Sequence, residues 1–149
     1  GNDLAARENM SLAALLSGLA LANSGLGAAH GLASALGAYY PIPHGLACAI
    51  LLPYVMELNL EVNPTRFARI WEALTGISNY NNPLQAAGAG VKFVKELIVA
   101  LDIPPDLKSY GIDQALAPVL AAASFGSSMS GNPKDVSLDE LTTLLQKLL

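Results

Sequence analysis

Two histidines are the residues best suited to chemistry, because His30 and His44 are the only imidazoles in the chain. They are fourteen positions apart, and each lies near the start of an apolar run of helical character. Pro41 and Pro43 stiffen the segment between them, since proline fixes its own φ and favours an extended predecessor. A helix, a rigid turn and a helix N-terminus in this order can bring both rings together. Imidazole is the commonest protein ligand of transition metals, so the spacing indicates a metal site.

The same residues also allow structural roles, with His30 as a hydrogen-bonded core residue and His44 as a helix cap. Two ligands are too few for tight, selective binding of a metal. Cys48 follows His44 by one helical turn, and a soft thiolate there could bind metal, although a buried structural cysteine is the commoner use of this residue. Asp3 and Glu8 precede the site, but no spacing argument brings them near it.

The composition predicts a single domain that must hide much apolar surface. The chain has 149 residues, of which 52% are hydrophobic and only 13% are charged, whereas about 25% charged residues is typical. No Asp, Glu, Lys or Arg occurs from Asn9 to Met56. The rest of the fold, another domain, a partner or lipid must therefore cover this run.

Charge and patterning exclude two classes of partner. The net charge of −4 leaves no basic surface for phosphates, so nucleic acid is not expected to bind. A membrane helix needs about 20 apolar residues, and polar residues or prolines interrupt both candidate spans, which also lack flanking Lys or Arg. Charged residues precede the apolar run, so the N-terminus does not resemble a signal peptide. The single cysteine excludes an internal disulfide and predicts a cytoplasmic protein.

The pattern of caps and breaks predicts an all-α fold, a compact array of about seven helices built around the first three. Helices are expected over residues 4–22, 28–40, 44–58, 64–75, 84–101, 112–127 (divided at Pro118) and 138–149. Expected N-caps are Asp3, Asn63, Asn82 and the Ser137–Glu140 capping box. In the fifth helix, Phe93, Leu97 and Leu101 form the expected apolar stripe. Within the second, Gly31 and Gly37 are expected to allow close approach of another backbone or a ligand.

The stretch GLGAAHGLASALGAYYPIPHG around the two histidines resembles a signature of the iron-containing (group III) alcohol dehydrogenases. Flanking matches are Ala6–Met10, Ala49–Pro53 and Gly131–Lys134. In that family, the histidines that correspond to His30 and His44 bind the catalytic metal. The resemblance therefore implies Fe(2+) as the bound metal, with Zn(2+) as the alternative, and places the remaining Asp and His ligands in upstream sequence.

The resemblance further implies an enzyme that interconverts small alcohols and aldehydes or ketones by metal-assisted hydride transfer to NAD or NADP. Residues 1–149 correspond to the helical, dehydroquinate synthase-like metal-binding domain, as a C-terminal fragment of a two-domain enzyme that lacks its nucleotide-binding domain. NAD(P) would bind mainly outside this chain, which contains no glycine-rich turn between a strand and a helix. The isolated chain is expected to be inactive, to expose an apolar patch near His30 and His44 and to self-associate.

Ser34 is a departure from the resemblance, because many members of the family carry a third histidine at this position. Serine does not titrate near neutral pH, so no role in proton transfer is assigned to it. A reading of a different class also stays open: a non-catalytic helical subunit-interface domain in which both histidines are structural.

Overall fold

The chain folds into seven α-helices and three short 3-10 turns without any strand, in a computed structural model that describes residues 1–149. The helices are α1 (Leu4–Ser24), α2 (Ala28–Tyr39), α3 (His44–Asn59), α4 (Pro64–Thr75), α5 (Pro83–Ala100), α6 (Ala117–Ala123) and α7 (Leu138–Leu148). The 3-10 turns are Lys108–Tyr110, Gln114–Leu116 and Ser127–Met129. The predicted all-α class with about seven helices is confirmed.

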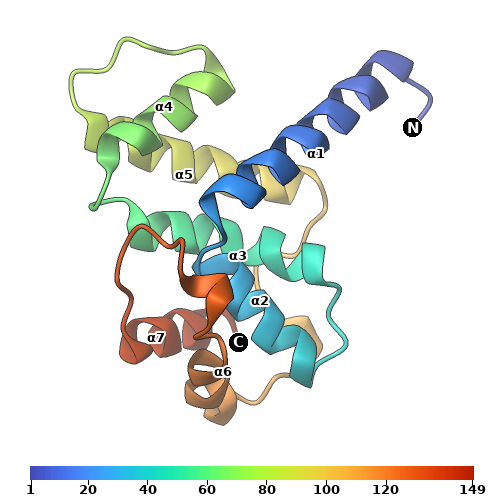
Figure 1. The fold of residues 1–149 in the computed structure, drawn as a ribbon, viewed down its shortest axis with the longest axis vertical. Helices are drawn as coiled ribbons and strands as arrows, with labels where there is room; N and C mark the ends of the chain where they lie inside the picture. Colours follow the sequence, from blue (N-terminus) through green and yellow to red (C-terminus); the bar gives the residue numbers. More distant parts are fainter.

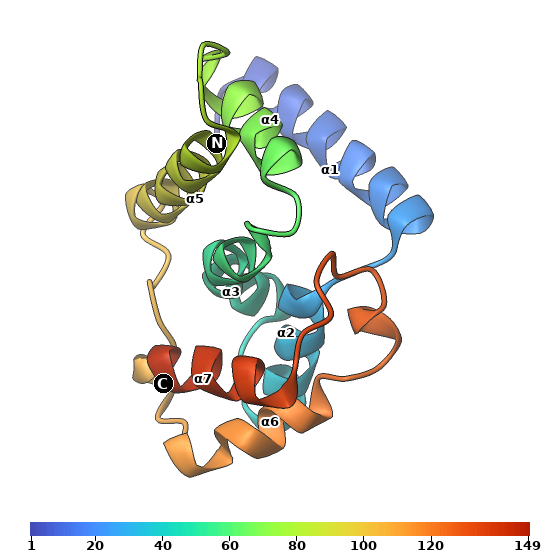
Figure 2. The same ribbon diagram turned by 90° about the vertical axis from the view of Figure 1, so that its left-hand side faces the viewer.

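Three helix pairs build the molecule. Helix α4 packs against α5, α2 against α3, and α6 against α7, while α3 also contacts α5 and α2 contacts α6. The α2–α3 pair therefore lies between the other two pairs (Figures 1 and 2). The main core of 20 buried residues comes from α2, α3, α6, α7 and their connections. A smaller buried cluster joins α3 to α5.

Local sequence signals begin the helices where expected. The side chains of Asp3, Asn63, Asn82 and Ser137 each accept a hydrogen bond from a backbone N–H in the first turn of the following helix. Ser137 and Glu140 form the complete capping box. Gly76 ends α4 in the left-handed conformation at φ 73°, which glycine adopts without steric penalty.

The predicted core face of α5 is wrong. Leu97 and Leu101 are 41% and 60% exposed, and the large apolar side chains that are buried are instead Val91, Val94 and Ile98. These three residues follow the spacing i, i+3, i+7 of a helical stripe equally well. Their partner on α3 is Met56, and this contact selects the face.

Helix α1 is the second departure, because it is not part of the centre around which the other helices pack. None of its residues is buried, and it projects away from α2 with the N-terminus at its free end (Figure 1). Its exposed large apolar residues are Leu4, Met10, Leu12, Leu15, Leu16, Leu19 and Leu21. No single helix is long and apolar enough to cross a membrane; only α1 and α2 taken together, bent by 100°, meet the criteria of length and composition.

Candidate metal centre

The turn between α2 and α3 brings the two histidines together. His30 lies in the first turn of α2, and His44 is the first residue of α3. Within the connection, the Ile42 N–H donates to the Tyr40 carbonyl at 2.8 Å, and the Ile42 side chain is buried in the main core. The buried isoleucine therefore anchors the proline-stiffened turn and fixes where α3 begins.

The two imidazole rings lie with their centroids 5.4 Å apart and their planes at 61°. Cys48 joins them from the next turn of α3, with its Sγ 3.5 Å from His44 Nε2. One ligand atom from each of the three residues lies within 4.8 Å of the others. His44 is exposed, whereas His30 and Cys48 are half-buried. The cluster is thus open to solvent on the His44 side.

Burial and charge favour the metal-binding form of His30. Burial lowers the pKa of His30 below its ordinary value of 6.5, and the neighbouring His44 lowers this pKa further. A neutral imidazole offers a free lone pair to a metal at neutral pH. Burial raises the pKa of the Cys48 thiol, so its proton must leave when the sulfur binds a metal. Nitrogen and sulfur donors are ligands that Zn(2+) and Fe(2+) accept in proteins, so these residues fit a divalent metal.

A distant loop holds the start of α2, and with it His30. The N-cap of α2 is Gly27, which has no side chain, and the Ala28 N–H instead donates to Asn132 Oδ1 at 3.1 Å. The Gly131 N–H donates to the Leu26 carbonyl at 2.7 Å. A Cβ on Gly131 would lie 2.6 Å from that carbonyl oxygen, so this close approach requires glycine.

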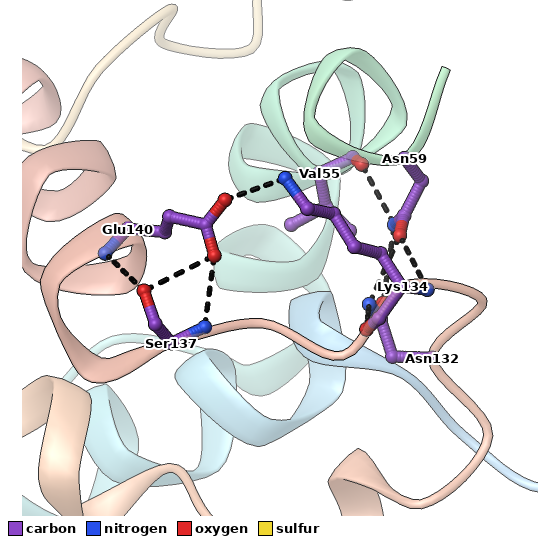
Figure 3. A network of polar contacts seen from close by, with 6 residues as sticks. All are labelled: Val55, Asn59, Asn132, Lys134, Ser137 and Glu140. Atoms are coloured by element: carbon purple, nitrogen blue, oxygen red, sulfur yellow. Dashed lines mark hydrogen bonds and ion pairs between the residues drawn. The ribbon is translucent and has the colours of Figure 1, made fainter. Parts of the chain in front are cut away.

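Asn132 is itself fixed by a polar network that joins α3, the loop and α7 (Figure 3). Its Nδ2 donates to Asn59 Oδ1 at 2.9 Å, and Asn59 Nδ2 donates back to Asn132 Oδ1 at 3.1 Å. Lys134 donates its backbone N–H to Asn59 Oδ1 at 3.2 Å and pairs with Glu140 at the start of α7. Asn59 is buried, and no buried side-chain nitrogen or oxygen in the chain lacks a partner.

The structure brings some of the candidate site residues together and separates others from them. His30, His44 and Cys48 come together. Asp3 and Glu8 belong to the free end of α1, which is 21 residues long and so extends about 30 Å. Ser34 is exposed on α2. The role of Asn132 was missed, since 104 positions separate it from Ala28 and its loop has no periodicity.

Comparisons with known proteins place this all-helical chain in a family. Residues 1–149 match the sequence model of the C-terminal region of the Fe-containing alcohol dehydrogenase family. The 1,3-propanediol dehydrogenase of Klebsiella pneumoniae is 37% identical in an alignment that covers 99% of this chain and 38% of that protein. The NADPH-dependent butanol dehydrogenase of Clostridium saccharobutylicum is 34% identical over 97% of this chain and 38% of its own length.

A solved structure shows the same fold. The crystal structure of a 1,3-propanediol oxidoreductase superposes with a TM-score of 0.95 at 32% identity, over 99% of this chain and 39% of the other. The chain therefore belongs to the Fe-containing alcohol dehydrogenase family and corresponds to its C-terminal region. It spans less than two-fifths of the length of these relatives.

Proposed function

We propose that His30 and His44 are two ligands of the catalytic metal in an NAD(P)-dependent alcohol dehydrogenase. The observation that carries this proposal is the convergence of the two imidazoles, with ring centroids 5.4 Å apart, in a chain of this family. The family favours Fe(2+) as the metal, and Zn(2+) is the alternative. The exposed side of His44 leaves room for further ligands and for substrate.

The reaction moves a hydride from the carbon of a small alcohol to NAD(P)⁺ and the hydroxyl proton to solvent, or the reverse from an aldehyde or ketone. When bound, a divalent metal supplies Lewis acidity to the alcohol oxygen. The contribution of this chain is to hold the metal and to provide apolar surface beside it. A cavity of about 290 Å³ lies next to His30, with Leu52, Met56 and Phe67 in its wall, and such a wall suits the carbon chain of the substrate.

The nucleotide-binding domain and the remaining metal ligands are proposed to lie in an upstream segment that packs on α1 and on the metal site. Two observations support this proposal. The chain spans 37% of the length of one 1,3-propanediol dehydrogenase and 39% of the solved 1,3-propanediol oxidoreductase, and α1 buries none of its apolar side chains. The isolated chain should therefore lack dehydrogenase activity and should self-associate, with a sedimentation coefficient that increases with concentration.

Metal analysis and activity test the ligand assignment in a polypeptide that carries this chain with its upstream segment. His30→Ala and His44→Ala should each lower metal content and remove most activity, because a metal site that loses one donor also loses its geometry. The matched control is Ser34→Ala, one turn from His30 on the exposed side of α2. It should retain the metal and change kcat by less than about tenfold, below the 10²–10⁴-fold of a lost general acid or base.

The alternative reading, a non-catalytic interface domain with structural histidines, makes the opposite prediction. Both histidine variants would then keep wild-type metal content and lose subunit association instead. Metal content and sedimentation of the same samples separate the two functions.

A further inference from the structure

Cys48 lies on α3, the helix that also carries the proposed metal ligand His44, and its side chain faces that histidine. Cys48 follows His44 by four residues on α3, a spacing that places two side chains on one helix face. Its Sγ lies 3.5 Å from His44 Nε2. Because both residues belong to one continuous helix, the helix backbone fixes this proximity without any loop closing around it.

The separation of these two atoms matches that of two ligands on one metal ion. Zn–S and Zn–N distances of about 2.3 Å and about 2.0–2.1 Å, at a tetrahedral angle, give an S···N separation of about 3.6 Å. The observed distance is 3.5 Å. Ligand atoms of His30, His44 and Cys48 all lie within 4.8 Å of one another, so small rotations of the side chains let all three reach one ion.

The environment of Cys48 differs from that of a purely structural cysteine. The residue is half-buried and packs at the edge of the main core rather than inside it. Its thiol faces His44 across the exposed side of the cluster. The apolar interior next to it is filled by Ala47 and Ile50, which are both fully buried.

We propose that Cys48 is a third metal ligand from this chain, so that His30, His44 and Cys48 form a site that prefers Zn(2+) to Fe(2+). This inference rests on the proposed function, because it assumes that the two histidines bind the metal. The thiol proton leaves to solvent as the sulfur binds. A soft thiolate shifts the preference of a site toward zinc, and Zn(2+) already binds nitrogen and sulfur sites more tightly than Fe(2+).

Cobalt(II) is the probe, because it takes the place of zinc and reports its ligands by absorption. Titration of the chain with Co(2+) should produce a thiolate-to-cobalt charge-transfer band in the near ultraviolet. Cys48→Ser and Cys48→Ala should lose that band and retain the weaker visible bands that the two histidines give. Competition should show that Zn(2+) affinity falls at least about tenfold in both variants, whereas Fe(2+) affinity changes less. Far-UV circular dichroism checks that the variants stay helical.

Each outcome decides between the two proposals. Co(2+) binding to the wild-type chain with visible bands but no charge-transfer band would overturn the role of Cys48 and leave the histidine ligands standing, whatever the stability of the variants. Unchanged Zn(2+) affinity in folded Cys48→Ala would have the same consequence. If His30→Ala and His44→Ala also left Co(2+) binding unchanged, the proposed function itself would fail. Ser34→Ala is the matched control and should keep every band.

Discussion

Helix α1 and the α2–α3 pair are both apolar, yet they behave in opposite ways. Helix α2 buries six residues and α3 buries seven, whereas the longer α1 buries none. Helices α2 and α3 pack on each other and on α5 and α6, while α1 projects from the body of the molecule (Figure 1). An apolar composition indicates that a helix must be covered by other segments. The buried residues show that α2 and α3 are covered and that α1 is not. We infer that the partner of α1 lies outside residues 1–149.

The sharpest test of this comparison pairs two leucines. Leu36 of α2 is fully buried, and Leu16 of α1 is 56% exposed. Leu36→Ala should lower the free energy of unfolding by about 2–5 kcal/mol, the usual range for a buried leucine. Leu16→Ala should change it by less than about 0.5 kcal/mol. Urea denaturation measures both, at a protein concentration low enough to keep the chain monomeric.

The same two variants, Leu16→Ala and Leu36→Ala, can also be compared in a polypeptide that carries the upstream segment. If that segment covers α1, Leu16→Ala should then become destabilising while the effect of Leu36→Ala stays the same. A large effect of Leu16→Ala in the dilute chain alone would contradict the exposed position of α1.

Two asparagines extend the comparison to polar contacts. Asn132 caps α2 and bonds to buried Asn59, so Asn132→Ala leaves buried polar groups without partners and should lower the free energy of unfolding by about 1–3 kcal/mol. Asn23 of α1 makes only a local bond to the Leu19 carbonyl. Asn23→Ala is the matched control and should have almost no effect in the same denaturation experiment. Equal effects of the two variants would mean that the network does not hold α2.

Two N-caps give a smaller contrast of the same kind. Ser137→Ala removes the capping box of α7, whose leucines lie in the main core, and should lower the free energy of unfolding by about 1 kcal/mol. Asp3→Ala removes the cap of α1. It should reduce helix content by circular dichroism without changing the urea midpoint, because α1 does not pack on the core. A shift of that midpoint in Asp3→Ala would show that α1 unfolds together with the body.

The contrast also explains what the sequence could predict. Caps act within one turn, so Asp3 and the Ser137–Glu140 box were readable from neighbouring residues. The proximity of His30 and His44 was readable as well, because one short stiff turn joins their helices. Their role as metal ligands stays a proposal.

Contacts between segments that are distant in the sequence could not be predicted from local patterns. The core face of α5 depends on Met56 of α3, and no local pattern distinguishes Val91, Val94 and Ile98 from the stripe that was predicted. The same holds for the two glycines at which close packing was expected, Gly31 and Gly37. The expected close approach holds at Gly31, where a Cβ would lie 2.7 Å from the Ser124 carbonyl oxygen, but at Gly37 the nearest atom is 3.9 Å away.

The smallest expected effect is the dependence of stability on pH at the start of α7. The hydrogen bond from Lys134, followed in size by the bond from the Ser137 backbone N–H, lowers the pKa of Glu140 from an ordinary value of 4.5 to about 2. A carboxyl group with a lowered pKa in the folded state stabilises that state when it is ionised. The contribution is therefore complete above about pH 4.5 and is lost as the pH falls toward about 2.

Glu140→Gln tests this contribution, because the amide keeps the shape of the side chain and cannot ionise. The wild-type chain should be more stable than Glu140→Gln at pH 6, and the difference should shrink between about pH 4.5 and pH 2, the interval between the two pKa values. Urea denaturation of both proteins across this interval measures the change. Lys134→Gln is the second variant, since it removes the largest cause of the shift and should flatten most of the same dependence. A difference between the wild-type chain and Glu140→Gln that stays constant from pH 6 to pH 2 would show that Glu140 stabilises α7 through its shape and not through its charge.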